Sequence, residues 1–253
     1  GTPRVQTAAH DIGKGAYTVI ALTVADRLGI GIDKISVEIG DSDLPPAPVA
    51  GGSNTTASVC NVVAKACEQI RARLADAAVA GKDAVFAGEN PSQLVLADWA
   101  LKGPNGQTMP IGDAIARASN GAIEAYAENV PHGVPPEALK KLYQGHATLA
   151  GGAKMKDRIQ FAFGAEFVEV RVHARTREIR VPRLVGAFAA GQIVDPLTAK
   201  SQLMGGMIWG VSSALHEATE IDRLRARYTN TDLAEYLIPV NADIQATEVI
   251  FVP

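Results

Sequence analysis

A run of small and hydroxyl-bearing residues, GGSNTTAS at 51–58, carries the clearest chemical signal in the sequence. Ser53, Asn54 and Thr55 are each suited to cap the N-terminus of a helix, and the two glycines before them let a ligand approach the backbone closely. Free N–H groups and hydroxyls at a helix N-terminus attract anions, most often phosphate. The same residues also fit an ordinary capped helix that follows a glycine-rich loop, so this stretch alone leaves both interpretations open.

Two further loops have a related composition. Residues 11–15 read DIGKG, where Lys14 is suited to meet a phosphate or to stay solvated, and Asp11 to close the loop rather than to act as an acid. Residues 191–198 read GQIVDPLT, with its proline placed for the first turn of a helix. Gln202 follows Thr198 by one helical turn, where its amide would bond a backbone group or a ligand oxygen.

The usual catalytic arrangements are missing from the sequence. It has no G-x-S-x-G, Walker or G-x-G-x-x-G motif, and no carboxylate pair is placed for acid–base work. Its five histidines are scattered, and Cys60 and Cys67 are expected to pack as small core residues, so we predict neither a catalytic residue nor a protein-ligated metal. Three anion-compatible loops without a base fit a domain that holds a large phosphorylated cofactor, which would carry the reactive chemistry itself.

The hydrophobic pattern predicts the elements that position the first two loops. Strands are expected at Val5–Ala8 and Ile35–Ile39, and helices at Tyr17–Leu28 and Thr55–Leu74. Gly29 fits the C-terminal cap of the first helix. The order is therefore strand, loop and helix, repeated once.

The rest of the chain is read in two parts. Residues from about 80 to 155 are rich in Ala, Gly and Pro and are expected to form a peripheral insertion, with a strand over 94–101 and short helices opening at Pro110 and Pro135. A hairpin is expected from Ile159–Val172 and Ile179–Ala189, followed by a helix from Pro196 to about Thr219.

Composition sets the outer bounds. The chain has 253 residues, 47% of them hydrophobic, and a formal net charge of -3, which does not indicate nucleic-acid binding by bulk charge. No apolar run approaches the length of a membrane span. Both termini read as if they interrupt a strand, so we expect a piece of a longer polypeptide; its compartment is left open.

Several separated blocks, taken in order, resemble one family. They are AHDIGKGAYT at 9–18, VEIGDSD at 37–43, GGSNTTAS at 51–58 and GAFAAGQIVDPLTAKSQLMGGMIWG at 186–210. Together they are similar to the molybdenum-binding subunit of the xanthine dehydrogenase/aldehyde oxidase family, in particular to bacterial periplasmic-type aldehyde oxidoreductases. The resemblance covers nearly the whole chain and implies an α+β fold of mixed sheets packed with helices, the second molybdopterin-binding domain of these enzymes.

The resemblance also implies a cofactor and the residues that hold it. The cofactor is molybdopterin cytosine dinucleotide with molybdenum. Ile12, Gly13 and Lys14 would offer backbone groups to the pterin or its phosphates, and Thr55 and Thr56 would hold the pyrophosphate or pterin region. The loop that would wrap the dinucleotide end consists of Gln192, Ile193, Val194, Asp195, Pro196, Leu197 and Thr198, and Gln202 would bond near the molybdenum-side groups.

The implied reaction is the oxidation of a small aldehyde to a carboxylic acid, with oxygen taken from water. Electrons would leave through partner subunits that carry 2Fe-2S and FAD, and the N-terminal half of the molybdenum subunit would complete the pocket. The family's catalytic Glu lies in a Gly-x-Gly-Glu-like segment that this sequence lacks, so the chain alone is expected to be inactive. Asp195 stands where the family usually has Asn, and Lys14 where Gln is common.

Two alternatives accompany this interpretation. The chain could be a non-catalytic cofactor-binding or assembly module. Alternatively, the enzyme could hydroxylate N-heteroaromatic compounds or oxidise carbon monoxide, because most residues that would select the substrate lie outside this sequence.

Overall fold

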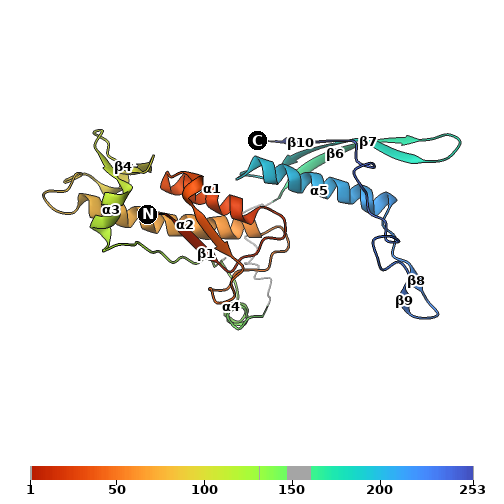
Figure 1. The fold of residues 1–253 in the computed structure, drawn as a ribbon, viewed down its shortest axis with the longest axis horizontal. Helices are drawn as coiled ribbons and strands as arrows, with labels where there is room; N and C mark the ends of the chain where they lie inside the picture. Colours follow the sequence, from red (N-terminus) through yellow and green to blue (C-terminus); the bar gives the residue numbers. More distant parts are fainter. Residues whose placement is uncertain (1, 131, 147–160, 253) are drawn as a thin grey trace. The chain divides into compact units, whose positions relative to one another are not determined.

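The computed structural model describes residues 2–130, 132–146 and 161–252. The chain divides into two compact units, Gly1–Lys156 and Asp157–Pro253, which are described separately below. Figure 1 gives the labels of the helices and strands.

Unit 1 begins with a β-α-β arrangement. Strand β1 (Arg4–Thr7) pairs in parallel with β2 (Ser36–Ile39), and α1 (Ala16–Leu28) with the short 3-10 helix η1 (Ile32–Lys34) connects them. Helix α2 (Thr55–Val79) follows β2. The predicted order of strand, loop and helix is confirmed, and α2 extends five residues beyond the predicted end because Ala75 and Ala78 continue its buried stripe.

The core of unit 1 lies between α1, α2 and one face of the β1–β2 pair. Apolar side chains at helical spacing on both helices meet there, including Ile20 and Val24 of α1 with Val59 and Val63 of α2. Cys67 is buried in this cluster as predicted, and Cys60 is half-buried. The opposite face of the strands is polar, where Glu38 accepts hydrogen bonds from Arg4 and Gln6.

Gly29 ends α1 in the left-handed conformation, with φ at 59°, as its place in the sequence predicted. A Cβ atom at this position would lie 2.5 Å from the Cα atom of Ala97, so the backbone at residues 96–97 passes directly over the glycine. Glycine is therefore required here both by the backbone angle and by the close approach.

The middle segment forms a small antiparallel sheet and short helices. Its elements are η2 (Pro91–Gln93), β3 (Val95–Ala97), β4 (Ala100–Lys102), β5 (Thr108–Pro110), α3 (Ile111–Ala118) and α4 (Pro136–Tyr143). The prediction of one strand over 94–101 is wrong, because Asp98 and Trp99 both have positive φ and form a tight turn between β3 and β4. Both helices predicted to open at prolines are present.

Residues of this middle segment also reach the core. Phe86 and Leu101 are almost fully buried in the same cluster as α1 and α2, and Met109 joins them. The peripheral insertion at about 80–155 therefore stays a prediction. Within that range, buried residues between 84 and 114 contribute to the main core.

Unit 2 is a mixed three-stranded sheet with a helix on one face (Figure 1). Strands β6 (Phe163–Val172) and β7 (Ile179–Ala189) form the predicted hairpin, α5 (Pro196–Leu215) follows, and β10 (Ala246–Phe251) pairs in parallel with β7. The first residues of the predicted strand, 159 and 160, lie outside the described residues. A small hairpin of β8 (Ile221–Asp222) and β9 (Arg227–Tyr228) separates α5 from β10.

Helix α5 packs on the sheet through Met207 and Val211, which contact Leu184 of β7. It ends at Leu215, four residues before the predicted end. Mixed sheets packed with helices were predicted, and the α+β fold is confirmed. In the described part of the chain, no helix has the length and apolar character needed to cross a membrane.

Candidate functional site

The first two glycine-rich loops lie at the same edge of unit 1. Strands β1 and β2 are parallel, so their carboxyl ends meet at one edge, and each strand is followed by a loop and then a helix. Ligands of open α/β sheets bind at this kind of edge. The residues Ile12–Lys14 and Thr55–Thr56 are thereby brought to one end of the unit.

Two contacts show that α1 and α2 run in the same direction. The thiol of Cys60 approaches the carbonyl oxygen of Val19 at 3.8 Å, and Arg27 pairs with Glu68 at 3.7 Å. Both contacts join residues 41 positions apart, which is the register of parallel helices. The N-termini of α1 and α2 therefore lie side by side, each with the partial positive charge of a helix dipole.

At α1, that positive end already has an internal anion. The Asp11 carboxylate accepts hydrogen bonds from the N–H groups of Gly13 and Lys14 at 2.9 Å and of Ala16 at 2.6 Å. Burial acts to raise the pKa of Asp11, but these hydrogen bonds outweigh it and hold the pKa below its ordinary value. Asp11 thus closes the loop, one of the two roles considered for it, and the Lys14 ammonium donates to the His10 carbonyl.

At α2, the described residues provide neither a side-chain cap nor an acidic residue in the first turn. Asn54 occupies the N-cap position, but its side chain makes no capping hydrogen bond. Its Oδ1 atom is buried and has no hydrogen-bond partner in the described part of the chain. Thr55 is buried and Thr56 half-buried at the start of the helix, behind Gly52 and Ser53, which both have positive φ. The helix start is confirmed, but side-chain capping, the ordinary alternative for this stretch, is absent.

The third loop belongs to unit 2 and is closed in the same way as the first. The Asp195 carboxylate accepts from the N–H groups of Leu197 at 3.1 Å and Thr198 at 3.3 Å. A hydrogen bond from the Thr198 hydroxyl and these N–H groups lower the pKa of Asp195. Pro196 opens α5 as predicted, and Gln202 lies on its exposed side.

The predicted site residues therefore fall into two groups. Unit 1 brings Ile12, Gly13 and Lys14 to the same edge as Thr55 and Thr56, whereas the loop from 192 to 198 and Gln202 lie in unit 2. The sequence did not single out Asn54 as a site residue, although its place among three candidate capping residues was the available signal. The sequence also did not show which helix N-termini are closed by an aspartate.

At the α1 end of this edge, the Asp11 carboxylate is engaged by three N–H groups and closes the loop. Burial raises the pKa of the Cys67 thiol to about 11, so this thiol is not a ready nucleophile. The described residues contain no group of three or more His, Cys, Asp or Glu side chains that could hold a metal ion. What unit 1 offers is an edge with two helix N-termini, one of them open, which suits a phosphate-bearing ligand.

Comparison with known proteins decides the family. The family profile of the molybdopterin cofactor-binding domain matches residues 1–245. The chain belongs to this family. The resemblance to the molybdenum-binding subunits of the xanthine dehydrogenase/aldehyde oxidase family is thereby confirmed.

Two relatives show how far the similarity extends along the chain. The aldehyde oxidoreductase molybdenum-binding subunit PaoC of Escherichia coli O157:H7 is 34% identical over 251 residues, covering 99% of this chain and 30% of PaoC. The xanthine dehydrogenase molybdenum-binding subunit of the same organism is 27% identical over 255 residues, covering 100% of this chain and 31% of that subunit. The chain thus spans about 30% of the length of these relatives.

The fold agrees with this assignment. The crystal structure of quinoline 2-oxidoreductase from Pseudomonas putida 86 matches with a TM-score of 0.75 at 18% identity, covering 98% of this chain and 29% of that one. The α+β fold of this molybdopterin cofactor-binding domain is therefore that of the molybdenum hydroxylases.

The orphaned Asn54 Oδ1 tests whether the residues fit the cofactor. The uncapped N–H groups at the start of α2 are donors that a phosphate can satisfy, whereas the orphaned Asn54 Oδ1 is an acceptor and needs a donor. The α2 N-terminus of this family member therefore fits a phosphate of the molybdopterin cofactor.

Proposed function

We propose that this chain is the cofactor-binding part of a molybdenum hydroxylase that oxidises aldehydes to carboxylic acids with water as the oxygen source. The 34% identity to an aldehyde oxidoreductase subunit supports the aldehyde as substrate. The alternative of an N-heteroaromatic substrate has less support, since the xanthine dehydrogenase subunit matches at 27% identity. A non-catalytic module is the second alternative.

The observation that carries this proposal is the difference between the two adjacent helix N-termini. The α1 end is neutralised by Asp11, whereas the α2 end is open and lies beside the unpartnered Asn54 amide. The N–H groups of Thr55 and Thr56 hold the pyrophosphate of molybdopterin cytosine dinucleotide, where the dipole of α2 favours negative charge. Phosphate oxygens only accept hydrogen bonds, so the Asn54 amide presents Nδ2 to the ligand. A flip of the amide allows this, because its two orientations have the same shape.

Ile12, Gly13 and Lys14 line the same edge next to the pterin. Because the N–H groups of Gly13 and Lys14 donate to Asp11, their contribution comes from carbonyl groups and from the exposed side chain of Ile12. Asp11 keeps this loop in one conformation and so orients these groups before the cofactor binds.

The loop of unit 2 contacts the nucleotide end. The α5 N-terminus is closed by Asp195, so the contacts come from the backbone of Gln192, Ile193 and Val194 and from the exposed Leu197, with Pro196 and Thr198 fixing the helix start. An Asn at 195 would cap α5 equally well, so the departure from the family residue changes the charge of the loop and not its shape. The side chain of Gln202 forms a hydrogen bond with the cofactor, close to the groups on its molybdenum side.

When bound, the cofactor supplies the two-electron oxidation. The residues of this chain bind and orient it, and none of them acts as a catalytic base. The base belongs to another part of the subunit, the N-terminal half completes the pocket, and partner subunits with 2Fe-2S and FAD accept the electrons. The names of relatives as subunits of enzyme complexes support the presence of partner subunits.

The experiment is elemental and nucleotide analysis of the protein purified from cells that make the cofactor. We expect molybdenum and cytidine monophosphate, released by acid hydrolysis, in equal amounts. A guanine nucleotide, or a pterin without nucleotide, would contradict the dinucleotide form, and absence of molybdenum would contradict the proposal as a whole. Enzyme-like aldehyde turnover by the loaded chain alone would show that the base lies within it.

A further inference from the structure

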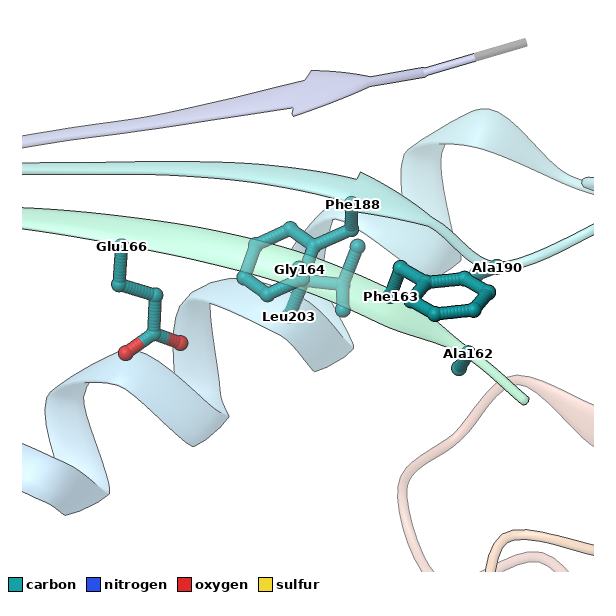
Figure 2. Close-up of a pocket in the computed structure, with 7 residues that line it drawn as sticks. All are labelled: Ala162, Phe163, Gly164, Glu166, Phe188, Ala190 and Leu203. Atoms are coloured by element: carbon teal, nitrogen blue, oxygen red, sulfur yellow. The ribbon is translucent and has the colours of Figure 1, made fainter.

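Unit 2 contains a pocket of about 410 Å³ between β6 and α5 (Figure 2). Its walls include Phe163 and Gly164 of β6, Phe188 of β7 and Leu203 of α5, and one carboxylate, that of Glu166. This volume lies in the range of small-molecule sites. None of the lining residues is among those assigned to the cofactor, although Ala190 and Leu203 adjoin the third loop and Gln202.

The Phe188 ring at this pocket is held in place by its neighbours. Gly164 stands opposite Phe188 in the β6–β7 register, and a Cβ atom on Gly164 would lie 2.7 Å from the Phe188 ring. The ring therefore occupies the space that a side chain would fill. Phe163 makes an edge contact with Phe161 at a centroid distance of 6.1 Å. The Phe188 ring thus has a defined position at the pocket, whereas Phe163 is exposed and alternates to the other face of β6 from Glu166.

The carboxylate of Glu166 has no cationic partner in the described part of the chain, unlike the other glutamates on this sheet. Glu169 pairs with Arg171 at 2.7 Å, and Glu248 pairs with Arg183 at 3.5 Å. Glu166 stands opposite Gly186, which has no side chain to cover it. Figure 2 shows the Glu166 carboxylate directed toward α5, on the same side of the strands as the Phe188 ring and Leu203.

We propose that this pocket binds an organic cation, an apolar stem that ends in an ammonium or guanidinium group. The stem contacts Phe188 and Leu203, and the head pairs with Glu166. Aromatic rings next to a carboxylate favour such ligands because the faces of the rings and the carboxylate both attract positive charge. The head comes from a free amine or from a Lys or Arg side chain of another polypeptide.

The test is an NMR titration of the full chain with phenethylammonium and with its neutral counterpart 2-phenylethanol, following the Leu203 methyl groups. We expect the ammonium to bind about fivefold tighter than the alcohol, as a partly exposed cation gains from one carboxylate and an aromatic face. Glu166→Gln removes this preference. Glu169→Gln is the matched control, because Glu169 lies on the same strand, belongs to the opposite face and has its own arginine.

Equal binding of the two probes, or no change at Leu203 with either, would overturn the proposal, and so would an ammonium preference that survives Glu166→Gln. If that variant does not fold, the comparison of the two probes on the unaltered chain decides the question. A blocked Leu-Lys-Leu peptide that binds tighter than phenethylammonium identifies a polypeptide side chain as the ligand, and a weaker one identifies a free amine.

Discussion

The thiol of Cys60 on α2 lies 3.8 Å from the carbonyl oxygen of Val19 on α1, and the Thr23 hydroxyl donates to the same oxygen at 2.7 Å. This contact places the first turns of two parallel helices next to each other. Two positive dipole ends then face the same edge, which is unfavourable unless negative charge lies nearby. Asp11 supplies that charge at α1, and we propose that the cofactor pyrophosphate supplies it at α2.

Asp11→Ala should destabilise unit 1 by about 1–2 kcal/mol, because two N–H groups of the loop and that of Ala16, the first residue of α1, lose their acceptor. Urea denaturation at neutral pH measures this change. Asp83→Ala is the control, since Asp83 is exposed and removal of its carboxylate should stay within about 0.5 kcal/mol. Equal effects of the two variants would show that Asp11 does not hold the loop.

The contribution of Asp11 should depend on pH in one direction. Its folded-state pKa is lowered, so the stabilisation is fully present above the ordinary pKa of Asp, about 4, and is lost as the pH falls through the folded-state value. The stability difference between the unaltered chain and Asp11→Asn should therefore shrink on acidification. A difference that grows on acidification would contradict the assignment.

Gly29→Ala should cost at least about 2 kcal/mol, since φ is positive and the new Cβ would lie 2.5 Å from backbone atoms of Leu96 and Ala97. Gly88→Ala separates the two causes. Its φ is also positive, but no atom lies within 4 Å of the added Cβ, so only the conformational cost of about 1 kcal/mol applies. Thermal unfolding of both variants measures the difference, and similar losses would argue against the close approach of β3.

Asp195→Ala should weaken the start of α5 by about 1 kcal/mol, whereas Asp195→Asn should change stability little, because Asn is as good an N-cap as Asp. Hydrogen exchange of the first-turn amides of α5 reports this locally. Faster exchange in the Asn variant than in the Ala variant would refute the capping role.

Local patterns accounted for much of the fold. The order of β1, α1, β2 and α2, the β6–β7 hairpin and the start of α5 at Pro196 follow from periodicity and from capping residues, which act over a few positions. The turn at Asp98 and Trp99 could not be predicted, because Trp is not a turn-forming residue. The burial of Phe86 depends on long-range contacts that periodicity does not reveal.

The helix start at Thr55 was predictable from the sequence, and the electrostatics of the candidate site were not. The hydroxyl and glycine pattern pointed to Thr55 and Thr56, and the family blocks pointed to the cofactor. Which N-termini are closed depends on where the Asp11 and Asp195 side chains turn in three dimensions. The open state of α2 therefore emerged only with the structure.

The most direct test of the central claim is an amide NMR titration of the chain with inorganic pyrophosphate, with sulfate at matched ionic strength as the control. We predict saturable shifts at Thr55, Thr56 and Asn54, with small changes at Leu197 and Thr198, whose N–H groups already donate to Asp195. Shifts that are strongest at Leu197 and Thr198, or no saturable change at residues 51–58, would contradict the assignment of α2 as the phosphate-binding end.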